Sequence, residues 1–190
     1  MALYHFSVRH VSRGKGQMVV ASAAYISGQR IYDGYYNKIH DYTSKSGVVF
    51  TEILTPEYVP ERLTDRETLW NEVEHVERNN KAQLAYSFDI ALQNELTLEE
   101  NIRLAKEFCQ EQFVARGMIV DLAVHEGKSD NEEEPDNLHF HVLAPIRPFT
   151  EEGIWGNKQR REYILDEDGN RVKDAKGKDM FNAVSTTGWN

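Results

Sequence analysis

The 190-residue sequence has a single cysteine and no long apolar run. Cys109 has no second cysteine to pair with, so an internal disulfide is excluded and a reducing cytoplasm is the expected location. No window of about eighteen apolar residues occurs, which excludes a membrane-spanning helix and predicts no membrane insertion. The N-terminus alternates apolar and polar residues from Leu3 to Val8, which argues against a secretory signal.

Several motifs that would assign a function directly are absent as well. There is no internal repeat, no glycine-rich phosphate-binding motif and no regular strand–helix alternation, so a parallel sheet is not expected. The His-Glu-x-x-His motif of zinc hydrolases is also missing. With 40% hydrophobic residues the chain can bury a core, and we expect one domain over residues 1–190. A new helix cap and an apolar residue follow at 186–189, which predicts the N-terminal part of a longer protein.

The hydrophobic pattern predicts an α+β fold with a central antiparallel β-sheet and helices packed mainly on one face. Gly28 is expected to end a helix of small residues, and Thr64 and Thr97 each begin a capping box. The tyrosine- and glycine-rich residues 32–47 are interpreted as an irregular surface loop. The expected strands are 3–10, 84–92, 118–125 and 138–145, the expected helices are 17–27, 64–79 and 97 to near 117, and an exposed hairpin is expected over 163–172.

Three histidines, His125, His139 and His141, are the first candidates for a site. The alternation of apolar residues with His139 and His141 predicts a strand that carries both imidazoles on one face. A neighbouring antiparallel strand ending at His125 would add a third imidazole, with the polar linker 126–137 as a long hairpin loop. Three neutral imidazoles leave coordination positions open on a divalent ion, which is typical of a catalytic metal. Ligand type alone leaves the identity of the ion open, zinc included.

The net charge of −9 hides a segregated distribution. Residues 1–50 carry a net charge of +4, residues 51–140 carry a net charge of −13, and residues 141–190 carry equal numbers of basic and acidic side chains. The basic first quarter also holds a cluster of tyrosines, and this combination is typical of single-stranded nucleic-acid binding. Ordinary surface variation is the alternative reading of the charge pattern. The residues expected to contact DNA are Arg13, Lys15, Arg30, Tyr32 and Lys45, with Lys158 and Arg160 in a second patch after Pro148.

Tyr25 follows a run of small residues, Ala21 to Ala24, and precedes Gly28. On local sequence alone, a tyrosine at the end of an amphipathic helix is usually half-buried core with its hydroxyl at the surface. The small neighbours leave unusual room on that helix, so a bulky molecule could approach the ring.

Eight short segments carry a family resemblance: Ser12–Gln17, Ala21–Gly28, Asp41–Thr43, Leu69–Glu74, Ala82–Ala85, Gly117–Met118, Asn137–Val142 and Trp155–Arg160. Together they resemble the MobA/MobL (MobQ-type) conjugative relaxases, which are single-strand DNA nickases of the His-hydrophobe-His (HUH) endonuclease class. The resemblance extends over essentially the whole chain. It departs at Tyr86-Ser87, where the family commonly carries Arg-Glu, so a carboxylate role there would move to Asp89 or be lost.

The resemblance implies a HUH relaxase fold in which Tyr25 is the catalytic nucleophile and the three histidines hold a divalent ion, magnesium or manganese. The Tyr25 oxygen would attack a phosphate at a plasmid transfer origin, giving a 5′-phosphotyrosyl linkage that is resealed after transfer. A tyrosine pKa is ordinarily about 10, so the phenol needs a proton acceptor, and Asp89 and Glu74 are the candidates. The implied partners are single-stranded DNA, an origin-of-transfer hairpin, accessory mobilisation proteins and a coupling protein.

Two other functions remain open from the residues. A noncatalytic DNA-binding or replication-initiator module would bind the same DNA and leave it uncut. A three-histidine metallohydrolase acting on a small molecule would need no basic, aromatic first quarter and would never become covalently attached to DNA.

Overall fold

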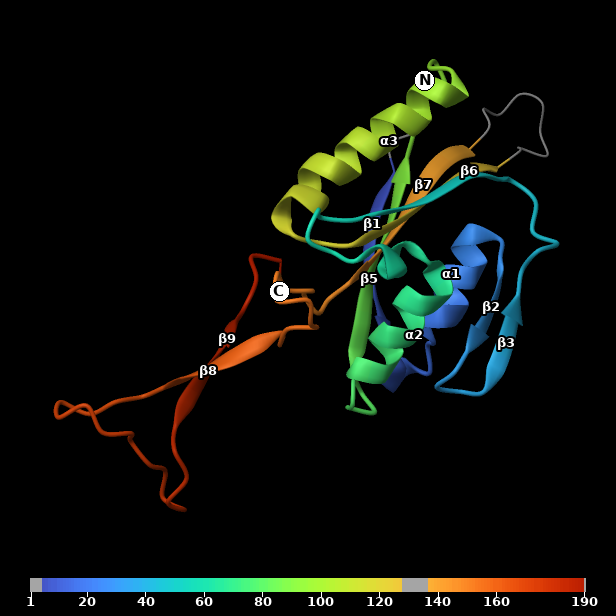
Figure 1. Ribbon diagram of the computed structural model, residues 1–190. Helices are drawn as coiled ribbons and strands as arrows, with labels where there is room; N and C mark the ends of the chain where they lie inside the picture. The colour runs from blue at the N-terminus through green and yellow to red at the C-terminus, as the bar shows by residue number, and fades with distance from the viewer. Residues whose placement is uncertain (1–4, 128–136, 190) are drawn as a thin grey trace.

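The computed structural model describes residues 5–127 and 137–189 and shows an α+β fold around a five-stranded antiparallel sheet (Figure 1). The strand order is β1-β5-β7-β6-β4. The predicted fold class is therefore confirmed. The sheet strands are β1 (Phe6–Ser12), β4 (Val48–Leu54), β5 (Gln83–Ala91), β6 (Val120–Gly127) and β7 (Asn137–Pro145). The helices are α1 (Val19–Ser27), α2 (Arg66–Val76) and α3 (Leu98–Gln112), with short 3₁₀ turns η1 (Arg13–Lys15), η2 (Glu61–Thr64) and η3 (Val114–Arg116).

The two faces of the sheet are buried by different helices. Ala85, Ala123 and Leu143 point toward α1 and α2 and form one apolar core with them. Val124 and Val142, each one residue away from Ala123 and Leu143 on the same strands, belong to a second core that includes buried residues of α3. Strand alternation thus places two of the three helices on one face, as predicted, and α3 on the other. Among the described residues, no helix is both long and apolar enough to cross a membrane.

The helix ends follow the capping rules at two of three predicted points. Thr97 and Glu100 form the predicted capping box at the start of α3, and Gly28 ends α1 with a φ of 63°. The predicted cap at Thr64 is wrong. The Thr64 hydroxyl donates to the Glu61 carbonyl within η2, and Asp65 caps α2 by accepting from the Thr68 amide at 2.8 Å. Helix α2 also ends earlier than expected, at Val76.

The chain between α1 and α2 contains more regular structure than expected. Residues 32–47 are not simply an irregular loop, because β2 (Arg30–Asp33) and β3 (Lys38–Asp41) pair as a hairpin. The Asp33 carboxylate accepts from the amides of Tyr35 and Tyr36 at 3.1 Å each and so closes the turn. The edge strand β4 was not predicted. Each of its seven residues is half-buried, so it lacks the alternation that marks a strand.

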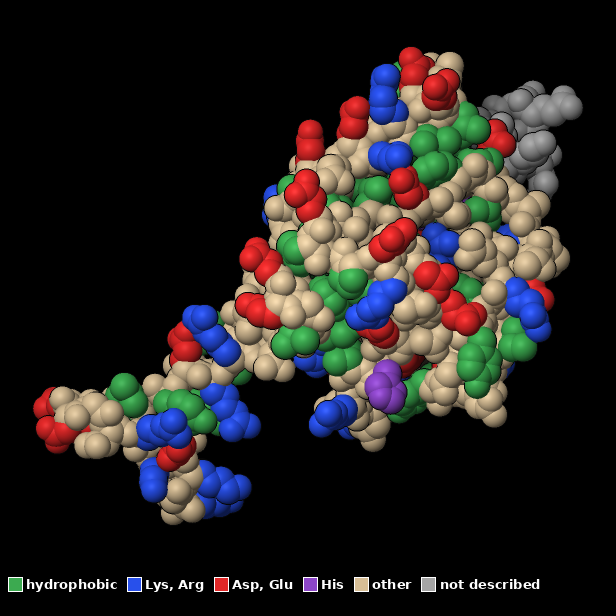
Figure 2. Space-filling view, viewed as in Figure 1, with side chains coloured by type: hydrophobic (Ala, Val, Ile, Leu, Met, Phe, Trp, Pro, Cys, Tyr) green, Lys and Arg blue, Asp and Glu red, His purple; other side chains and the backbone are tan. Residues whose placement is uncertain are grey.

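An arm extends from the sheet after Pro148 (Figure 1). Its base is the pair β8 (Gln159–Tyr163) and β9 (Phe181–Ser185). The predicted hairpin over 163–172 is present, with a turn that ends at Gly169 and a bridge between Leu165 and Arg171. A second turn near Gly177 was not predicted. Acidic side chains gather at the first tip and basic ones at the second (Figure 2).

The strand expected at 3–10 runs instead over Phe6–Ser12, and its first two expected residues lie outside the described part of the chain. Most of the predicted 126–137 loop, at 128–136, is likewise outside it. The strands on either side of that loop pair antiparallel down to Gly127 opposite Asn137. This pairing fixes the register of the three histidines.

Candidate active site

The three histidines meet on the face of the sheet that packs against α1. His139 and His141 are two residues apart on β7, and His125 on β6 is the direct cross-strand partner of His139. One nitrogen of each ring lies within 4.8 Å of the others. The ring centroids are 4.5 to 5.4 Å apart. The predicted convergence of two strands is therefore confirmed in geometry, and the cluster can hold a metal ion.

A hydrogen bond from α1 orients the His125 ring. Its Nε2 lies 2.6 Å from the carbonyl oxygen of Ile26, which only accepts, so Nε2 carries the proton. Nδ1 is then left with a lone pair. Metal-binding histidines commonly donate their other ring nitrogen to such a carbonyl, which fixes the tautomer and raises ligand basicity. The bond also joins the helix that carries Tyr25 to the strand that carries His125.

Burial keeps the imidazoles of His125 and His141 neutral. It lowers the pKa of His125 to about 4 and that of His141 to about 4. The Lys45 ammonium and the His139 ring lower both pKa values further, whereas the Asp89 carboxylate raises both and the hydrogen bond to the Ile26 carbonyl raises that of His125. Neutral rings with available lone pairs are the form that binds a divalent cation. The donor set therefore fits such an ion, with coordination positions left for other ligands.

Tyr25 and His141 border one groove. A cavity of about 430 Å³ is lined by Tyr25, His141 and Asp89, together with Arg9, Ser22 and Tyr42. The Tyr25 side chain is half exposed, and the small residues of α1 open the space beside it, as the sequence predicted. The structure thus brings the tyrosine, one histidine and one carboxylate around the same space.

Lys45 lies between Tyr25 and the histidines. Its Nζ is 3.7 Å from the centroid of the Tyr25 ring and donates to the Tyr25 carbonyl oxygen at 3.0 Å. The same Nζ is 3.5 Å from Nδ1 of His125. Burial lowers the pKa of Lys45. The Tyr42 ring meets Tyr25 edge-on at 5.4 Å, so the tyrosine is held between a cation and a second ring.

The two candidate carboxylates have different environments. Asp89 on β5 is the direct cross-strand partner of His141 and lines the groove. Glu74 is fully buried, forms an ion pair with Arg13 at 2.5 Å, and accepts from the Val19 amide at 3.1 Å. Glu74 therefore fixes the start of α1 and lies outside the groove. The prediction that Glu74 could be the proton acceptor for Tyr25 is corrected accordingly.

The prediction that Arg13 contacts DNA is corrected for the same reason. Its side chain is 5% exposed, and it donates to Glu74 and to the carbonyl oxygens of Glu77 and Asn79. A side chain so fully engaged within the fold is not available to DNA. The other predicted contacts reach the surface in different places. Lys15 and Tyr32 are exposed, Arg30 pairs with Asp41 at 3.6 Å, Lys158 pairs with Glu77 at 2.7 Å, and Arg160 pairs with Glu162 at 2.7 Å.

Arg9 and Tyr42 line the groove, although neither was among the residues predicted for the site. Arg9 is exposed on β1, directly opposite Ser87 of β5, and this register places it on the same face as Asp89. The two-residue spacing from Ser87 to Asp89 is visible in the sequence, but the pairing of β1 with β5 is not. Only the sheet register assigns Arg9 to the site.

Comparison with known proteins gives a consistent result. The model of the MobA/MobL family matches residues 17–190. The chain is 35% identical to a conjugal transfer protein TraA of Agrobacterium fabrum, covering 95% of this chain and 16% of that protein. It is 33% identical to the mobilization protein MobL of Acidithiobacillus ferridurans, covering 82% of this chain and 41% of that protein. The chain therefore spans less than half the length of these relatives.

One solved structure shares the fold closely. It comes from work on the molecular basis of vancomycin resistance transfer in Staphylococcus aureus. The two chains are 37% identical with a TM-score of 0.75, and the match covers 84% of this chain and 78% of that one.

Proposed function

The chain belongs to the MobA/MobL family, and from that premise we propose that it is the DNA-nicking domain of a plasmid-mobilising relaxase. The observation that carries the proposal is the single groove bordered by Tyr25, Asp89 and His141, next to the three-histidine cluster. The names of the relatives in conjugal transfer and mobilisation support it.

The proposed reaction is a transesterification at the transfer origin. The Tyr25 hydroxyl oxygen attacks the scissile phosphorus, a new tyrosine–phosphate ester forms, and the bond to the 3′ oxygen breaks. The products are a 5′-phosphotyrosyl strand and a free 3′-hydroxyl, which takes up a proton. One phosphodiester replaces another, so the reverse attack by a 3′-hydroxyl reseals the strand after transfer.

The charged and metal-ligating residues at and beside the groove have separate roles in this proposal. Asp89 accepts the proton of the phenol, because it is the carboxylate that lines the groove with Tyr25. Lys45 holds positive charge beside the Tyr25 ring, where it stabilises the oxygen anion as the proton leaves. A divalent ion, magnesium or manganese, held by His125, His139 and His141 would supply further charge to the phosphate oxygens.

The proposed substrate is single-stranded DNA that enters the groove from an origin hairpin. Arg9 lines the groove, Lys15 directly precedes the lining residues Gly16 and Gln17, and Lys45 contacts the Tyr25 ring, so the strand would meet basic side chains near the tyrosine. The arm offers Arg160 and the basic tip around Lys173 and Lys176 as a second contact patch (Figure 2). Accessory mobilisation proteins and a coupling protein are the further partners proposed for the whole protein.

Incubation with supercoiled plasmid carrying the cognate origin, followed by protein denaturation, tests the proposal. A nicked circle with protein attached to its 5′ end is expected, and Tyr25→Phe should abolish the adduct while DNA binding persists. Tyr42→Phe, which changes the neighbouring ring, is the matched control and should still form adduct. DNA that is bound but uncut would indicate the noncatalytic module. If the protein neither binds nor nicks the DNA, the small-molecule hydrolase is favoured.

Adding a chelator to the same assay tests the metal requirement separately from the role of Tyr25 as nucleophile. Removing divalent ions, or replacing His139 or His141 with alanine, should reduce cleavage by orders of magnitude. Excess metal should rescue the variants only in part. Wild-type cleavage that persists in chelator would refute the metal requirement and leave the tyrosine assignment standing.

A further inference from the structure

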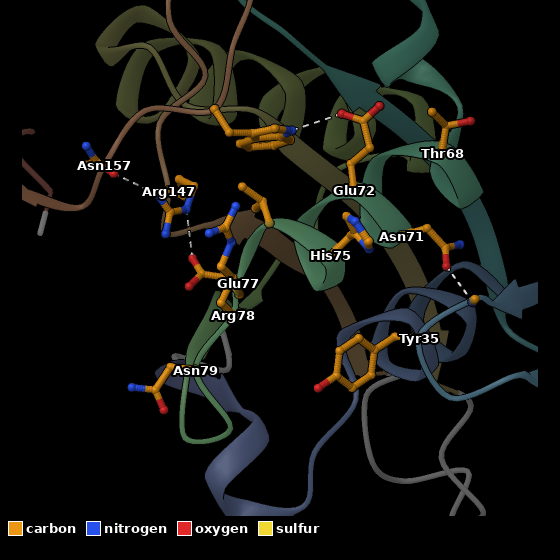
Figure 3. Close-up of a pocket in the computed structure, with 13 residues that line it drawn as sticks. Tyr35, Thr68, Asn71, Glu72, His75, Glu77, Arg78, Asn79, Arg147 and Asn157 are labelled. Carbon is orange, nitrogen blue, oxygen red and sulfur yellow. Dashed lines mark hydrogen bonds and ion pairs between the residues drawn. The ribbon is translucent and has the colours of Figure 1, made fainter.

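A second and larger cavity, of about 1190 Å³, lies at the base of the arm (Figure 3). It is bordered by the β2–β3 turn at Tyr35, by the C-terminal end of α2 at His75, and by the chain that follows β7 at Arg147. Neither Tyr25 nor any of the three histidines of the cluster lines it. Its volume is somewhat above the range of about 300 to 1,000 Å³ that is typical of sites for small organic ligands. The proposed nicking reaction assigns it no role.

The cavity wall carries two carboxylates, Glu72 and Glu77, and two guanidinium groups, Arg78 and Arg147, and each carboxylate is paired with a cation. The Glu77 carboxylate is shared between Arg147, at 3.1 Å, and Lys158, at 2.7 Å. Glu72 is already neutralised by Arg62 and accepts from the Trp155 indole at 2.9 Å. Within the described part of the chain, Arg78 has neither an ion pair nor a hydrogen bond. In the view of Figure 3 it lies between Arg147 and Tyr35. Because both carboxylates are already paired, the Arg78 guanidinium can pair with an anionic ligand.

Two aromatic side chains border the same space and are held in place. Trp155 is fixed by its bond to Glu72 and by an edge-on contact with Phe149 at 5.2 Å. Tyr35 is half exposed, and the Arg13 guanidinium lies 4.3 Å from its ring centroid. Rings that are already ordered lose little entropy when a planar ligand stacks on them. Stacking on such rings is how proteins bind a nucleobase whatever its sequence.

We propose that this cavity binds a nucleotide, with the base against Trp155 or Tyr35 and the phosphate on Arg78 and Arg147. Planar aromatic surface and unpaired positive charge in one cavity match the two parts of that ligand. The nucleotide is either a unit of a single strand held by this protein or a free mononucleotide. The proposal is independent of the nicking chemistry, because no proposed catalytic residue lines the cavity.

Titration with deoxynucleoside monophosphates, followed by the indole N–H signals of the ¹⁵N-labelled protein, tests the proposal. The chain has three tryptophans, and Trp155→Phe identifies the signal of Trp155. That signal should shift with dGMP and not with inorganic phosphate alone. Arg78→Ala should weaken binding about tenfold or more, since hydrogen bonds to charged groups contribute at this level. Arg103→Ala, an exposed arginine on α3, is the matched control and should bind normally.

A single-stranded oligonucleotide distinguishes the two sources. If the site takes a unit of DNA, the oligonucleotide shifts the Trp155 signal at lower concentration than dGMP and displaces it. If the site takes a free nucleotide, dGMP stays bound in the presence of the strand. Absence of any Trp155 shift with all four monophosphates and with the strand would overturn the proposal. A shift that neither Arg78→Ala nor Tyr35→Ala weakens would overturn it as well. None of these readouts depends on cleavage.

Discussion

The ammonium of Lys45 contacts the Tyr25 ring at 3.7 Å from its centroid and also lies 3.5 Å from Nδ1 of His125. Nδ1 is the ring nitrogen left with a lone pair, since Nε2 bonds to Ile26. One cation therefore contacts both the proposed nucleophile and a proposed metal ligand. A divalent ion bound at Nδ1 would be repelled by this ammonium unless the side chain moved toward the phosphate.

Lys45→Met should strengthen divalent-ion binding and slow cleavage. Methionine keeps an apolar stem beside the Tyr25 ring and removes the charge. Two like charges a few ångströms apart cost roughly 1 to 4 kcal/mol, so Mn²⁺ affinity should rise about tenfold or more. Cleavage should slow because the variant has no charge beside the attacking oxygen. Calorimetric titration with Mn²⁺ measures the first effect, and Arg103→Met is the control. A fall in Mn²⁺ affinity would show that Lys45 supports the ion.

Asp89→Asn should reduce the cleavage rate by about a hundredfold, the range of a missing general base, without unfolding the protein. The amide keeps the shape of the carboxylate on β5 but cannot accept the phenol proton. Ser87→Ala is the matched control, because Ser87 lines the same groove on the same strand without a carboxylate. Initial nicking rates measured across a pH series give the comparison. Equal loss in both variants would mean that the groove surface, rather than the carboxylate, is required.

Glu74→Ala should destabilise the protein by about 3 to 5 kcal/mol, because it leaves the buried Arg13 guanidinium without its counter-charge. Urea unfolding measures the change, and Glu57→Ala, at an exposed position, is the control. Nicking per folded molecule should be unchanged, since Glu74 lies outside the groove. A stable but inactive Glu74→Ala protein would return this carboxylate to the catalytic machinery.

The sequence predicted those parts of the site that depend on local periodicity. The alternation around His139 and His141 placed both rings on one face, and the pattern ending at His125 predicted the adjacent strand. Thr97 and Glu100 predicted a helix start because a capping box is complete within four residues. Each of these signals lies within a few residues of the chain.

The errors arise from contacts between distant segments. Arg13 was expected at the DNA surface, but its partner Glu74 lies 61 residues away, and no local pattern reveals that pair. Arg9 was passed over because its place in the groove depends on the register between β1 and β5. Strand β4 is half-buried along its length, so the alternation that identifies strands is absent.

The metal-free protein should lose stability as the pH falls from about 6.5 toward about 4. Burial lowers the pKa of His125 and of His141 to about 4, whereas an unfolded histidine titrates near 6.5. Between these values the unfolded chain binds more protons than the folded one, so the free energy of unfolding falls with falling pH. Urea unfolding in chelator at several pH values measures the slope. His141→Leu should flatten it, and an unchanged slope would mean that His141 is already charged in the fold.

The salt dependence of DNA binding should identify the basic side chains that contact the strand. Arg9→Gln and Lys15→Gln remove exposed charges beside the groove, since Arg9 lines it and Lys15 precedes the lining residues Gly16 and Gln17. Each DNA phosphate that a variant no longer neutralises should reduce the log–log slope by about 0.7 on single-stranded DNA. The measurement is binding of an origin oligonucleotide across a salt series.

The controls for this last prediction follow from the structure and not from charge alone. Arg66 is unsuitable because it is buried against Asp121 at 2.8 Å, so its loss would unfold the protein. Arg103 and Arg116 are exposed on and just after α3, on the other face of the sheet, and should leave the slope unchanged. Arg160→Gln should reduce the slope only if the arm contacts DNA, and an oligonucleotide without the hairpin should then remove that difference. Equal slopes for the Arg9, Lys15 and Arg103 variants would show that the strand does not run through the groove, and the proposed path of the DNA past Tyr25 would be wrong.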